Sequence, residues 1–530
     1  MTYKVLVSDK LGEAGVKLFE QEEGIEVDVK TDLTDEQLKD IIGDYDALAV
    51  RSSTKVTKEL LEAADKLKAI GRAGIGVDNI DVDEATRRGI IVMNTPGGNV
   101  VTTAEHAIAM MMSLTRNIPQ GTASLKAGRW DKKKLQGREI MNKTLGVIGF
   151  GKIGSIVANR ARGLKMNVVV YDPVVTPENI KKEKCEPVSL DELYERSDYI
   201  SIHVPKIKKT TKMINKDAFA KMKDGVMLIH CARGGIVDED ALYEALKMGK
   251  VGGAALDVFA TEPPPEGFKL FEFDNLICTP HLGASTVEAQ TNVAVDIAHQ
   301  LIGYLKTETI KNAVNVPSVS GKVLEELDPF IKLADRMGRM VAQLASGHIK
   351  SVEIDYDGNF GDHDLSPVRT SVICGLLEPL VLDDVNAVNA PYLAKEKGIK
   401  ILESSSDDAQ EFINLLTITV RTDKETNVVS GTLFGKSDPR IVRINDFRLE
   451  MRPEGYLALI QNMDIPGEIG SIGTILGDNS VNIARMTVGQ EEPEGERNIV
   501  FLRTDTPLTK EVLQRLENYP RTRQVIYMEL

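Results

Sequence analysis

Cysteine is scarce in this chain, and its few copies lie far apart. The 530 residues include four cysteines and no CxxC pair. A disulfide framework or a zinc ribbon needs closely spaced cysteines, so neither is predicted, and a reducing compartment fits the composition. The seven histidines form no HxxxH or HExxH arrangement, so the sequence predicts no metal site. The cysteines are Cys185, Cys231, Cys278 and Cys374.

An excess of positive charge and a long apolar run are also missing. Lys and Arg number 65 against 79 Asp and Glu, for a net charge of −14, so neither nucleic acid nor an anionic membrane is a predicted partner. The longest apolar helical stretch, 107–114, is far shorter than the ~20 residues of a membrane span. Residues 1–7 are typical of a first strand and not of a cleavable signal. These features predict a cytoplasmic protein.

Strand and helix patterns alternate over the first 285 residues, which is typical of parallel sheets covered by helices. One α/β unit ends near residue 98, and a second spans 99–284. The helix expected from 285 to about 305 carries the chain back to the first unit, so the first domain is discontinuous, 1–98 plus 285–316. Thr34 with Gln37, and Thr102 with Glu105, have the spacing of capping boxes at helix starts.

The pattern changes after residue 316. Residues 417–421 and 427–433 alternate like paired antiparallel strands, which predicts an α+β domain over 317–450. Residues 451–530 follow the order strand, helix, strand, strand, helix, strand. This order favours a ferredoxin-like module at the end of the chain.

A glycine-rich turn in the second unit has the GxGxxG form. Gly149, Gly151 and Gly154 follow an apolar strand and open a helix, where close approach of a diphosphate to the helix N-terminus is possible. Asp172 ends the next strand, 18 residues beyond Gly154, in the position of a carboxylate that binds the adenine ribose. Its charge would repel a 2′-phosphate. The cofactor predicted is therefore NAD and not NADP.

Three polar residues follow strands of the same predicted sheet. Arg233, Glu262 and His281 each come just after a strand, at the edge where ligands of such sheets bind. Their chemistry fits hydride transfer: the imidazole exchanges the hydroxyl proton, the carboxylate orients the imidazole, and the guanidinium binds a substrate carboxylate. His106 is predicted to be an interdomain contact. His203 is expected to line the cofactor cleft without reacting, and Cys231 to serve in packing.

The first unit supplies a predicted anion cradle. Arg51 and Ser52 follow one strand, Arg72 and Gly74 follow the next, and Asn99 lies where the chain crosses to the second unit. Two arginines at one sheet edge suit a second anionic group, such as a phosphate.

Together, the strings 51–56, 71–79, 149–154, 231–238, 253–259 and 280–286 resemble the D-isomer-specific 2-hydroxyacid dehydrogenases. The resemblance implies a Rossmann-type NAD domain and a flavodoxin-like substrate domain, both doubly wound parallel sheets, with Arg233, Glu262 and His281 as catalytic residues. Arg233 and His281 are also implied in substrate binding. The NAD contacts implied are Gly149, Gly151, Lys152, Ile153, Gly154, Asp172, Val204, Ala232, Arg233, Asp257, His281, Gly283 and Ala284.

The last eighty residues resemble an ACT domain, carried by 462–467 and 481–484. In related enzymes this module binds L-serine between paired subunits. The resemblance implies Asn462, Asp464 and Asn482 as effector residues. It also implies that 317–450 is the intervening domain of the long-chain members of the family.

Within the family, the resemblance implies NAD-dependent oxidation of 3-phospho-D-glycerate to 3-phosphohydroxypyruvate, the first step of L-serine biosynthesis, in a homo-oligomer, expected to be a tetramer. Two alternatives stay open. One is a different 2-hydroxyacid dehydrogenase, such as a glyoxylate or hydroxypyruvate reductase. The other is a regulator that binds nucleotide and amino acid without turnover.

Overall fold

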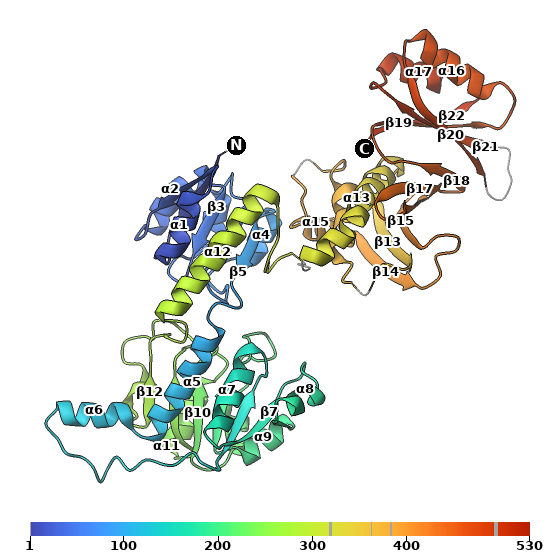
Figure 1. The fold of residues 1–530 in the computed structure, drawn as a ribbon. Coiled ribbons are helices and arrows are strands. Elements are labelled where there is room, and N and C mark those ends of the chain that lie inside the picture. The colour runs from blue at the N-terminus through green and yellow to red at the C-terminus, as the bar shows by residue number, and fades with distance from the viewer. Residues whose placement is uncertain (1, 317–320, 362, 382–383, 492–496) are drawn as a thin grey trace.

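The computed structural model describes residues 2–316, 321–361, 363–381, 384–491 and 497–530. Its strands form three sheets, and the chain is arranged as four units (Figure 1). The first four residues of the predicted third domain, 317–320, lie outside the described residues. No helix among the residues described has the length and apolar character needed to cross a membrane. The domain boundaries at 98, 284, 316 and 450 stay a proposal.

The first unit is a five-stranded parallel sheet in the order β2-β1-β3-β4-β5. This is the flavodoxin-like order, as predicted. Its strands are β1 (Tyr3–Val7), β2 (Ile25–Val29), β3 (Ala47–Val50), β4 (Ala69–Arg72) and β5 (Ile91–Asn94). Its helices are α1 (Glu13–Gln21), α2 (Asp35–Ile41), α3 (Lys58–Glu62) and α4 (Val82–Arg87), with a 3-10 turn η1 (Ile42–Asp44). The predicted capping box of Thr34 and Gln37 is confirmed at the start of α2.

The second unit is a seven-stranded parallel sheet in the order β12-β11-β10-β9-β6-β7-β8. The order reverses at β6, as in the Rossmann arrangement. Its strands are β6 (Thr144–Ile148), β7 (Asn167–Tyr171), β8 (Glu186–Pro187), β9 (Tyr199–Ile202), β10 (Val226–His230), β11 (Val251–Leu256) and β12 (Leu276–Cys278). Its helical elements are α5 (Val100–Thr115), α6 (Ile118–Lys126), α7 (Lys152–Gly163), α8 (Pro177–Lys182), α9 (Leu190–Arg196), α10 (Lys216–Lys221), α11 (Glu239–Lys247) and η2 (Lys269–Glu272).

Two long helices join these units. α5 packs on α7 and β11 of the second sheet, whereas α12 (Val287–Thr307) returns to pack on α1 and β4 of the first (Figure 1). The predicted capping box of Thr102 and Glu105 is wrong. α5 begins earlier, at Val100, so Thr102 already has a helical backbone, which an N-cap residue does not have.

The third and fourth units share one ten-stranded sheet in the order β14-β13-β15-β16-β17-β18-β20-β21-β19-β22. The predicted antiparallel pairing is confirmed, because β15 pairs with β16 from Leu416 opposite Gly431 to Arg421 opposite Thr426. The third unit comprises α13 (Gly321–Leu344), β13 (Ile349–Gly358), α14 (Ser366–Leu377), α15 (Ala390–Glu396), β14 (Lys400–Ser406), β15 (Asn414–Thr422), β16 (Thr426–Phe434), β17 (Asp438–Ile444) and β18 (Phe447–Met451).

The fourth unit has the predicted ferredoxin-like order, with its two helices on one face of its strands (Figure 1). It comprises β19 (Tyr456–Met463), α16 (Glu468–Asp478), β20 (Ile483–Glu491), β21 (Arg497–Thr504), α17 (Lys510–Glu517) and β22 (Thr522–Glu529). The sheet is continuous between the two units because β18 pairs with β20.

Candidate active site

The glycine-rich turn between β6 and α7 has the shape of a dinucleotide cradle. Gly149 has φ 93°, and a Cβ there would lie 2.7 Å from the His203 carbonyl oxygen. A Cβ on Gly154 would lie 2.0 Å from the Gly149 oxygen, so this position permits close packing of α7 on the turn. A Cβ on Gly151 would meet nothing within 4 Å, and α7 has no side-chain cap. The N–H groups of its first turn are therefore open to a diphosphate, and the residues fit NAD.

Asp172 lies directly beyond the end of β7, next to this turn. Its Oδ2 accepts a hydrogen bond from the Phe150 N–H at 2.7 Å, and its Oδ1 accepts from Val174 and Val175 at 2.7 and 2.9 Å. Burial raises the pKa of Asp172, but these three backbone donors outweigh burial and hold the pKa below its usual value. An ionised carboxylate is thus fixed beside the glycine turn, as the ribose contact requires.

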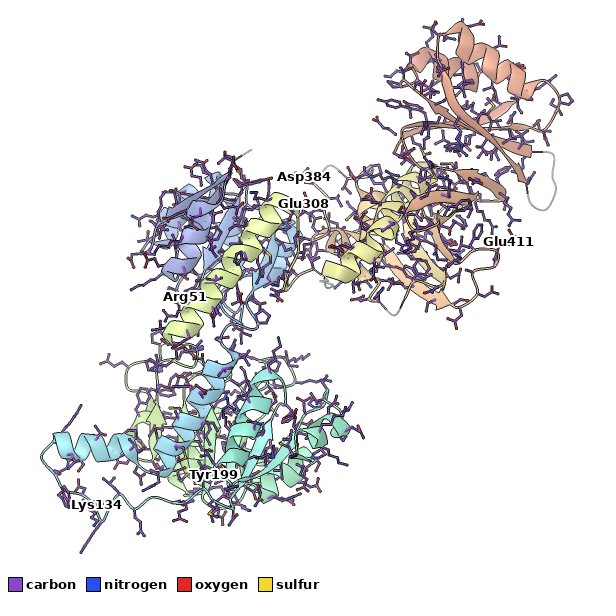
Figure 2. All side chains as sticks on the ribbon, in the orientation of Figure 1. Arg51, Lys134, Tyr199, Glu308, Asp384 and Glu411 are labelled. Carbon is purple, nitrogen blue, oxygen red and sulfur yellow. The ribbon has the colours of Figure 1, made fainter. Side chains whose placement is uncertain are left out.

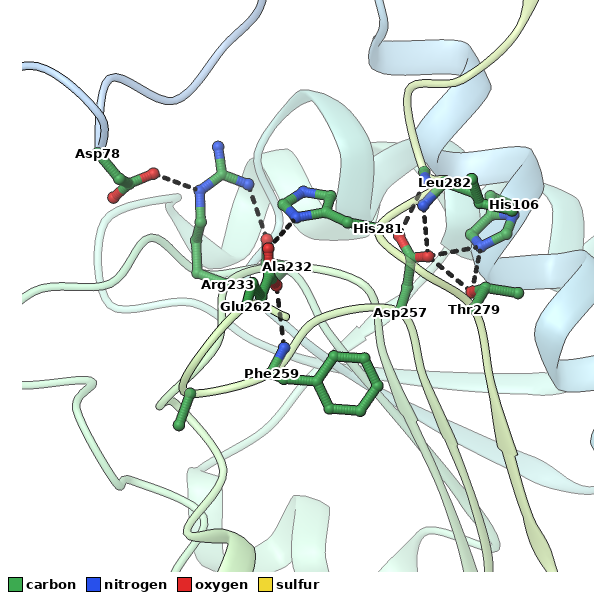
Figure 3. Close-up of polar contacts among 12 residues, drawn as sticks. Asp78, His106, Ala232, Arg233, Asp257, Phe259, Glu262, Thr279, His281 and Leu282 are labelled. Atoms are coloured by element: carbon green, nitrogen blue, oxygen red, sulfur yellow. Dashed lines mark hydrogen bonds and ion pairs between the residues drawn. The ribbon is translucent and has the colours of Figure 1, made fainter. Parts of the chain in front are cut away.

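His281 and Glu262 form a close pair, although 19 residues separate them. His281 Nδ1 lies 2.7 Å from Glu262 Oε2 (Figure 3). The other carboxylate oxygen of Glu262 accepts a hydrogen bond from the Phe259 N–H at 3.0 Å. Burial raises the pKa of Glu262, yet hydrogen bonds from His281 and Phe259 hold it below its usual value. The glutamate is therefore an anion that fixes one ring nitrogen, which leaves Nε2 for a substrate.

The loop that carries His281 is held by one buried carboxylate. Asp257 accepts hydrogen bonds from the N–H groups of Leu282 and Gly283 at 2.7 and 2.8 Å, and from the Thr279 hydroxyl at 2.6 Å. The backbone N–H of His281 donates to the Asp257 carbonyl at 3.0 Å, in a left-handed turn with φ 52° at His281. Asp257 thus sets the position of the imidazole.

His106 supports this carboxylate and does not join two units. Its Nε2 lies 3.2 Å from Asp257 Oδ1 and 3.2 Å from Thr279 Oγ1 (Figure 3). His106 lies in α5, which packs on the second sheet, and Asp257 and Thr279 directly follow β11 and β12 of that sheet. The prediction of an interdomain contact is therefore wrong for His106.

Arg233 is bound from the opposite unit. Its Nε donates to Asp78 Oδ2 at 3.2 Å, and its Nη1 donates to the Ala232 carbonyl at 2.7 Å (Figure 3). A Cβ on Gly76 would lie 2.2 Å from Arg233 Nη2, so the guanidinium rests directly on the backbone of the first unit. The sequence reasoning missed Asp78, because no local pattern joins it to a residue 155 positions away.

Two cavities of about 750 and 360 Å³ lie between the first and second units. Arg72, Arg233 and His281 line both, and Ser52 lines the larger one. The predicted residues that line the smaller cavity are Arg72, Asn99, Ile153, Val204, Ala232, Arg233, Asp257, His281, Gly283 and Ala284. His203 and Cys231 also line it. The structure therefore brings together most of the predicted cofactor, substrate and catalytic residues.

Arg72 differs from the other charged groups of the cleft. Its Nε is buried and has no hydrogen-bond partner within the described part of the chain. Burial, and then the neighbouring charge of Arg233, lower the pKa of Arg72 to about 10. Asp78 and Asp9 offset part of this effect by their charge, but neither forms an ion pair with Arg72 among the described residues. An arriving anion would relieve the remaining cost of the desolvated guanidinium.

The glycine turn and Asp172 lie outside the walls of these two cavities, and so do three further predicted residues, Arg51, Gly74 and Lys152. The Arg51 guanidinium donates from Nη1 to the Lys10 carbonyl at 3.0 Å. Figure 2 marks Arg51 on the first unit, at its side toward the second. Gly74 is covered by the Arg72 side chain, because a Cβ there would lie 1.6 Å from Arg72 Nη1. Lys152 is the exposed first residue of α7.

Two histidines and a cysteine lie at or behind the cleft wall, where His230 and Cys231 are buried and His203 is half-buried. Burial lowers the pKa of His203 to about 3 and that of His230 to about 4, so both rings are neutral near pH 7. Nε2 of His203 lies 2.7 Å from the Ser201 hydroxyl. Burial raises the pKa of the Cys231 thiol, which keeps it protonated and unsuited to act as a nucleophile.

The predicted effector residues do not come together within one chain. Asn462 is fully buried opposite Asn498, with no hydrogen-bond partner for either amide atom among the described residues. Asp464 accepts a hydrogen bond from Asn498 at 2.9 Å. Asn482 precedes β20 at the other end of the sheet, where Ile483 faces Thr504. Asn498 and Thr504 are six positions apart along β21, roughly 20 Å at the rise of a strand.

Three family models match the chain. Residues 108–283 match the D-isomer specific 2-hydroxyacid dehydrogenase, NAD binding domain. Residues 326–445 match the D-3-phosphoglycerate dehydrogenase intervening domain, and residues 456–521 match the ACT domain. The second unit is therefore an NAD-binding domain.

Curated relatives match over almost the whole length. The D-3-phosphoglycerate dehydrogenase of Archaeoglobus fulgidus is 42% identical over 528 residues, 99% of this chain and 100% of that protein. The chain belongs to the D-3-phosphoglycerate dehydrogenase family. The family member of Bacillus subtilis is also 42% identical, over 98% of each chain.

Solved structures of wider relatives resemble part of this family member. The D-lactate dehydrogenase of Aquifex aeolicus, in complex with NAD and lactic acid, is 32% identical with a TM-score of 0.52. A glyoxylate reductase from Paecilomyes thermophila is 29% identical with a TM-score of 0.54. Each match covers 59% of this chain, and 100% and 98% of the respective structures.

Proposed function

We propose that this protein oxidises 3-phospho-D-glycerate with NAD to 3-phosphohydroxypyruvate, the first step of L-serine biosynthesis. The observation that carries the proposal is the His281–Glu262 pair in a cleft that also holds Arg233 and the unpaired Arg72. Membership of the family supports the choice of substrate, because the relatives at 42% identity bear the name of that activity.

The catalytic roles follow from the geometry of three side chains. Glu262 holds His281 Nδ1, so Nε2 takes the proton from the C2 hydroxyl, and the glutamate stabilises the imidazolium that forms. Arg233 binds the C1 carboxylate with the donors that Asp78 and Ala232 leave free. NAD, when bound, supplies the hydride acceptor. The other second-unit residues that line the smaller cavity hold NAD and the 2-hydroxy acid in position for the transfer.

The first unit supplies recognition of the phosphate in this proposal. Arg72 is the central group, because its guanidinium has a buried Nε without a partner and forms no ion pair within the described residues. Ser52 and Asn99 line the same cleft, and Asn99 has a buried amide oxygen without a partner there. Gly74 makes room for the Arg72 side chain. Arg51 lies near enough to add positive charge to this side of the cleft.

Initial rates of NADH formation test the proposal. The purified enzyme should reduce NAD with 3-phospho-D-glycerate and should be much slower with D-glycerate. Equal rates with both substrates would instead identify a general 2-hydroxyacid dehydrogenase. Binding of NAD without turnover of any 2-hydroxy acid would favour the regulator.

We also propose that L-serine binds the ACT domain between two copies of this chain. Asn462 and Asp464 lie far from Asn482 within one chain, so one small ligand contacts all three only if a second subunit contributes. A homo-oligomer, taken to be a tetramer, meets this requirement. Light scattering should then show an oligomer, and Asn462→Ala should abolish inhibition by serine without lowering kcat. The cytoplasmic location stays a prediction from the sequence.

A further inference from the structure

One lysine of the cleft has no role in the proposed reaction. Lys206 follows β9 in the segment His203–Val204–Pro205–Lys206, and it lines both cavities together with Arg72 and Arg233. A Cβ on Gly235 would lie 3.3 Å from Lys206 Nζ, so the ammonium group lies over a loop position that carries no side chain. Lys206 therefore stands on the second-unit side of the cleft, over Gly235, which lies two residues along the chain from Arg233.

Lys206 forms no ion pair among the described residues, like Lys208 and Lys209 after it and unlike lysines further along the chain. Lys212, Lys221 and Lys223 form ion pairs with aspartates at 3.2, 2.7 and 3.0 Å. Across residues 2–316, no carboxylate lies within ion-pair distance of Lys206. A free ammonium group on the wall of a cleft is available to an anionic ligand.

The charges around Lys206 favour an anion with high negative charge. The smaller cavity is lined by the cations Arg72, Lys206 and Arg233, although the whole chain has a net charge of −14. Its carboxylates are already engaged, because Asp257 accepts several hydrogen bonds and Asp78 binds Arg233. Arg233 and His281 serve the carboxylate and hydroxyl end of the substrate. The other two cations are left for its second anionic group.

We propose that Lys206 binds the substrate's phosphate across the cleft from Arg72, and so determines the preference for a phosphorylated 2-hydroxy acid. This inference rests on the proposed function. An ammonium group is a compact point charge that tolerates many approach angles, which suits a phosphate bound between two units. Because Arg72 belongs to the first unit and Lys206 to the second, the dianion would join the two walls of the cleft.

The test compares two substrates in three variants. Lys206→Met removes the charge, Lys206→Arg restores it, and Lys208→Met is the matched control, since Lys208 lies in the same segment but outside both cavity walls. Lys206 is exposed, so the substitution should leave thermal unfolding unchanged. The measurements are kcat and KM for 3-phosphohydroxypyruvate and for hydroxypyruvate, together with the Kd of NADH.

Lys206→Met should raise KM for 3-phosphohydroxypyruvate about tenfold and leave KM for hydroxypyruvate unchanged. Lys206→Arg should restore most of the lost affinity, and Lys208→Met should behave as the wild type. Three results would overturn the inference: an equal rise for both substrates, a weaker NADH affinity in place of the KM change, or no change. A wild-type enzyme indifferent to the phosphate would instead refute the proposed function, whatever the variants do.

Discussion

The two walls of the cleft are built differently. On the second unit, Glu262 binds His281, Asp257 holds the loop behind it, and Arg233 is tied to Ala232 and to Asp78. On the first unit, Arg72 carries a buried charge with no carboxylate partner among the described residues. The second-unit groups that act on the reacting atoms are thus held by hydrogen bonds before substrate arrives, whereas Arg72 of the first unit has an unmet donor.

We interpret this difference as a division between groups that carry out the reaction and groups that recognise the substrate. Groups that act on the reacting atoms are most effective when hydrogen bonds fix them in advance. A group that selects a substrate by charge gains more when only that substrate satisfies it, because an analogue without the anion leaves it unpaired. In the proposed function, the second unit supplies the reacting groups, and preference for the phosphate comes from Arg72 of the first unit together with Lys206 of the second.

The largest effect is expected on kcat, when the imidazole of His281 is removed from the second-unit side of the cleft. His281→Ala should lower kcat by about 10³-fold, because general acid–base catalysis by a positioned side chain typically contributes 10²- to 10⁴-fold. Steady-state rates measure the loss, and calorimetry should show nearly unchanged NAD affinity. A kcat of His281→Ala within tenfold of the wild-type value would show that His281 does not transfer the proton.

The next largest effect is expected at Arg72 on the first-unit side of the cleft, where KM should change and not kcat. Arg72→Met should raise KM for 3-phosphohydroxypyruvate by roughly 100-fold, since losing a buried charge partner costs about 2–5 kcal/mol. KM for hydroxypyruvate should change little. Lys17→Met, on the exposed face of α1, is the control. A comparable rise for both substrates would place Arg72 in general binding and not in recognition of the phosphate.

Asp257→Asn tests whether the Asp257 carboxylate stabilises the loop that carries His281, and the quantity measured is the free energy of unfolding. The amide keeps one acceptor oxygen but replaces the other with an NH2 group that cannot accept a hydrogen bond, so the free energy of unfolding should fall by about 2–3 kcal/mol at neutral pH. Burial raises the pKa of Asp257, but hydrogen bonds from His106, Thr279 and Leu282 outweigh it and lower the pKa below 3.8.

The sign of the pH dependence follows from that lowered pKa. The ionised carboxylate stabilises the fold fully at pH values above the unfolded pKa of 3.8, and this contribution is lost as the pH falls through the folded pKa. Urea unfolding should therefore show a constant difference between wild type and Asp257→Asn from pH 8 to about 5, and a smaller one in stronger acid. A difference that grows in acid would contradict this account.

The smallest effect is expected at the contact between the walls. Asp78→Asn keeps an acceptor for Arg233 Nε but removes a negative charge near the substrate carboxylate. KM should fall roughly two- to fivefold, and equally for both substrates, as expected for a partly exposed ion pair. Steady-state kinetics at low salt would measure this fall in KM. A rise in KM would mean that the charge of Asp78 is needed to hold Arg233.

Local patterns predicted the elements of the site because each functional residue follows a strand or opens a helix. Gly149, Glu262 and His281 were found in this way, since parallel strands bring their carboxyl ends to one edge. The partners that hold them were missed. Asp78 and His106 act on residues 155 and 151 positions away, and no periodicity in the sequence encodes such pairings.

Prediction also failed where two local signals compete. Thr102 and Glu105 match a capping box, but the helix starts at Val100, and Thr103 donates its hydroxyl to the Asn99 carbonyl inside the first turn. The ACT residues depend on a partner that one chain does not show. The resemblance implied Asn462 and Asn482 in a site between paired subunits, and the register of β19, β20 and β21 places them at opposite ends of the sheet within one chain.

The ratio of kcat/KM for 3-phosphohydroxypyruvate over hydroxypyruvate, measured in the wild type, His281→Ala and Arg72→Met, tests the division between the two walls most directly. The ratio should be high in the wild type, stay high in His281→Ala at a far lower absolute rate, and collapse in Arg72→Met. A ratio that collapses in His281→Ala, or survives in Arg72→Met, would contradict the separation of reaction and recognition.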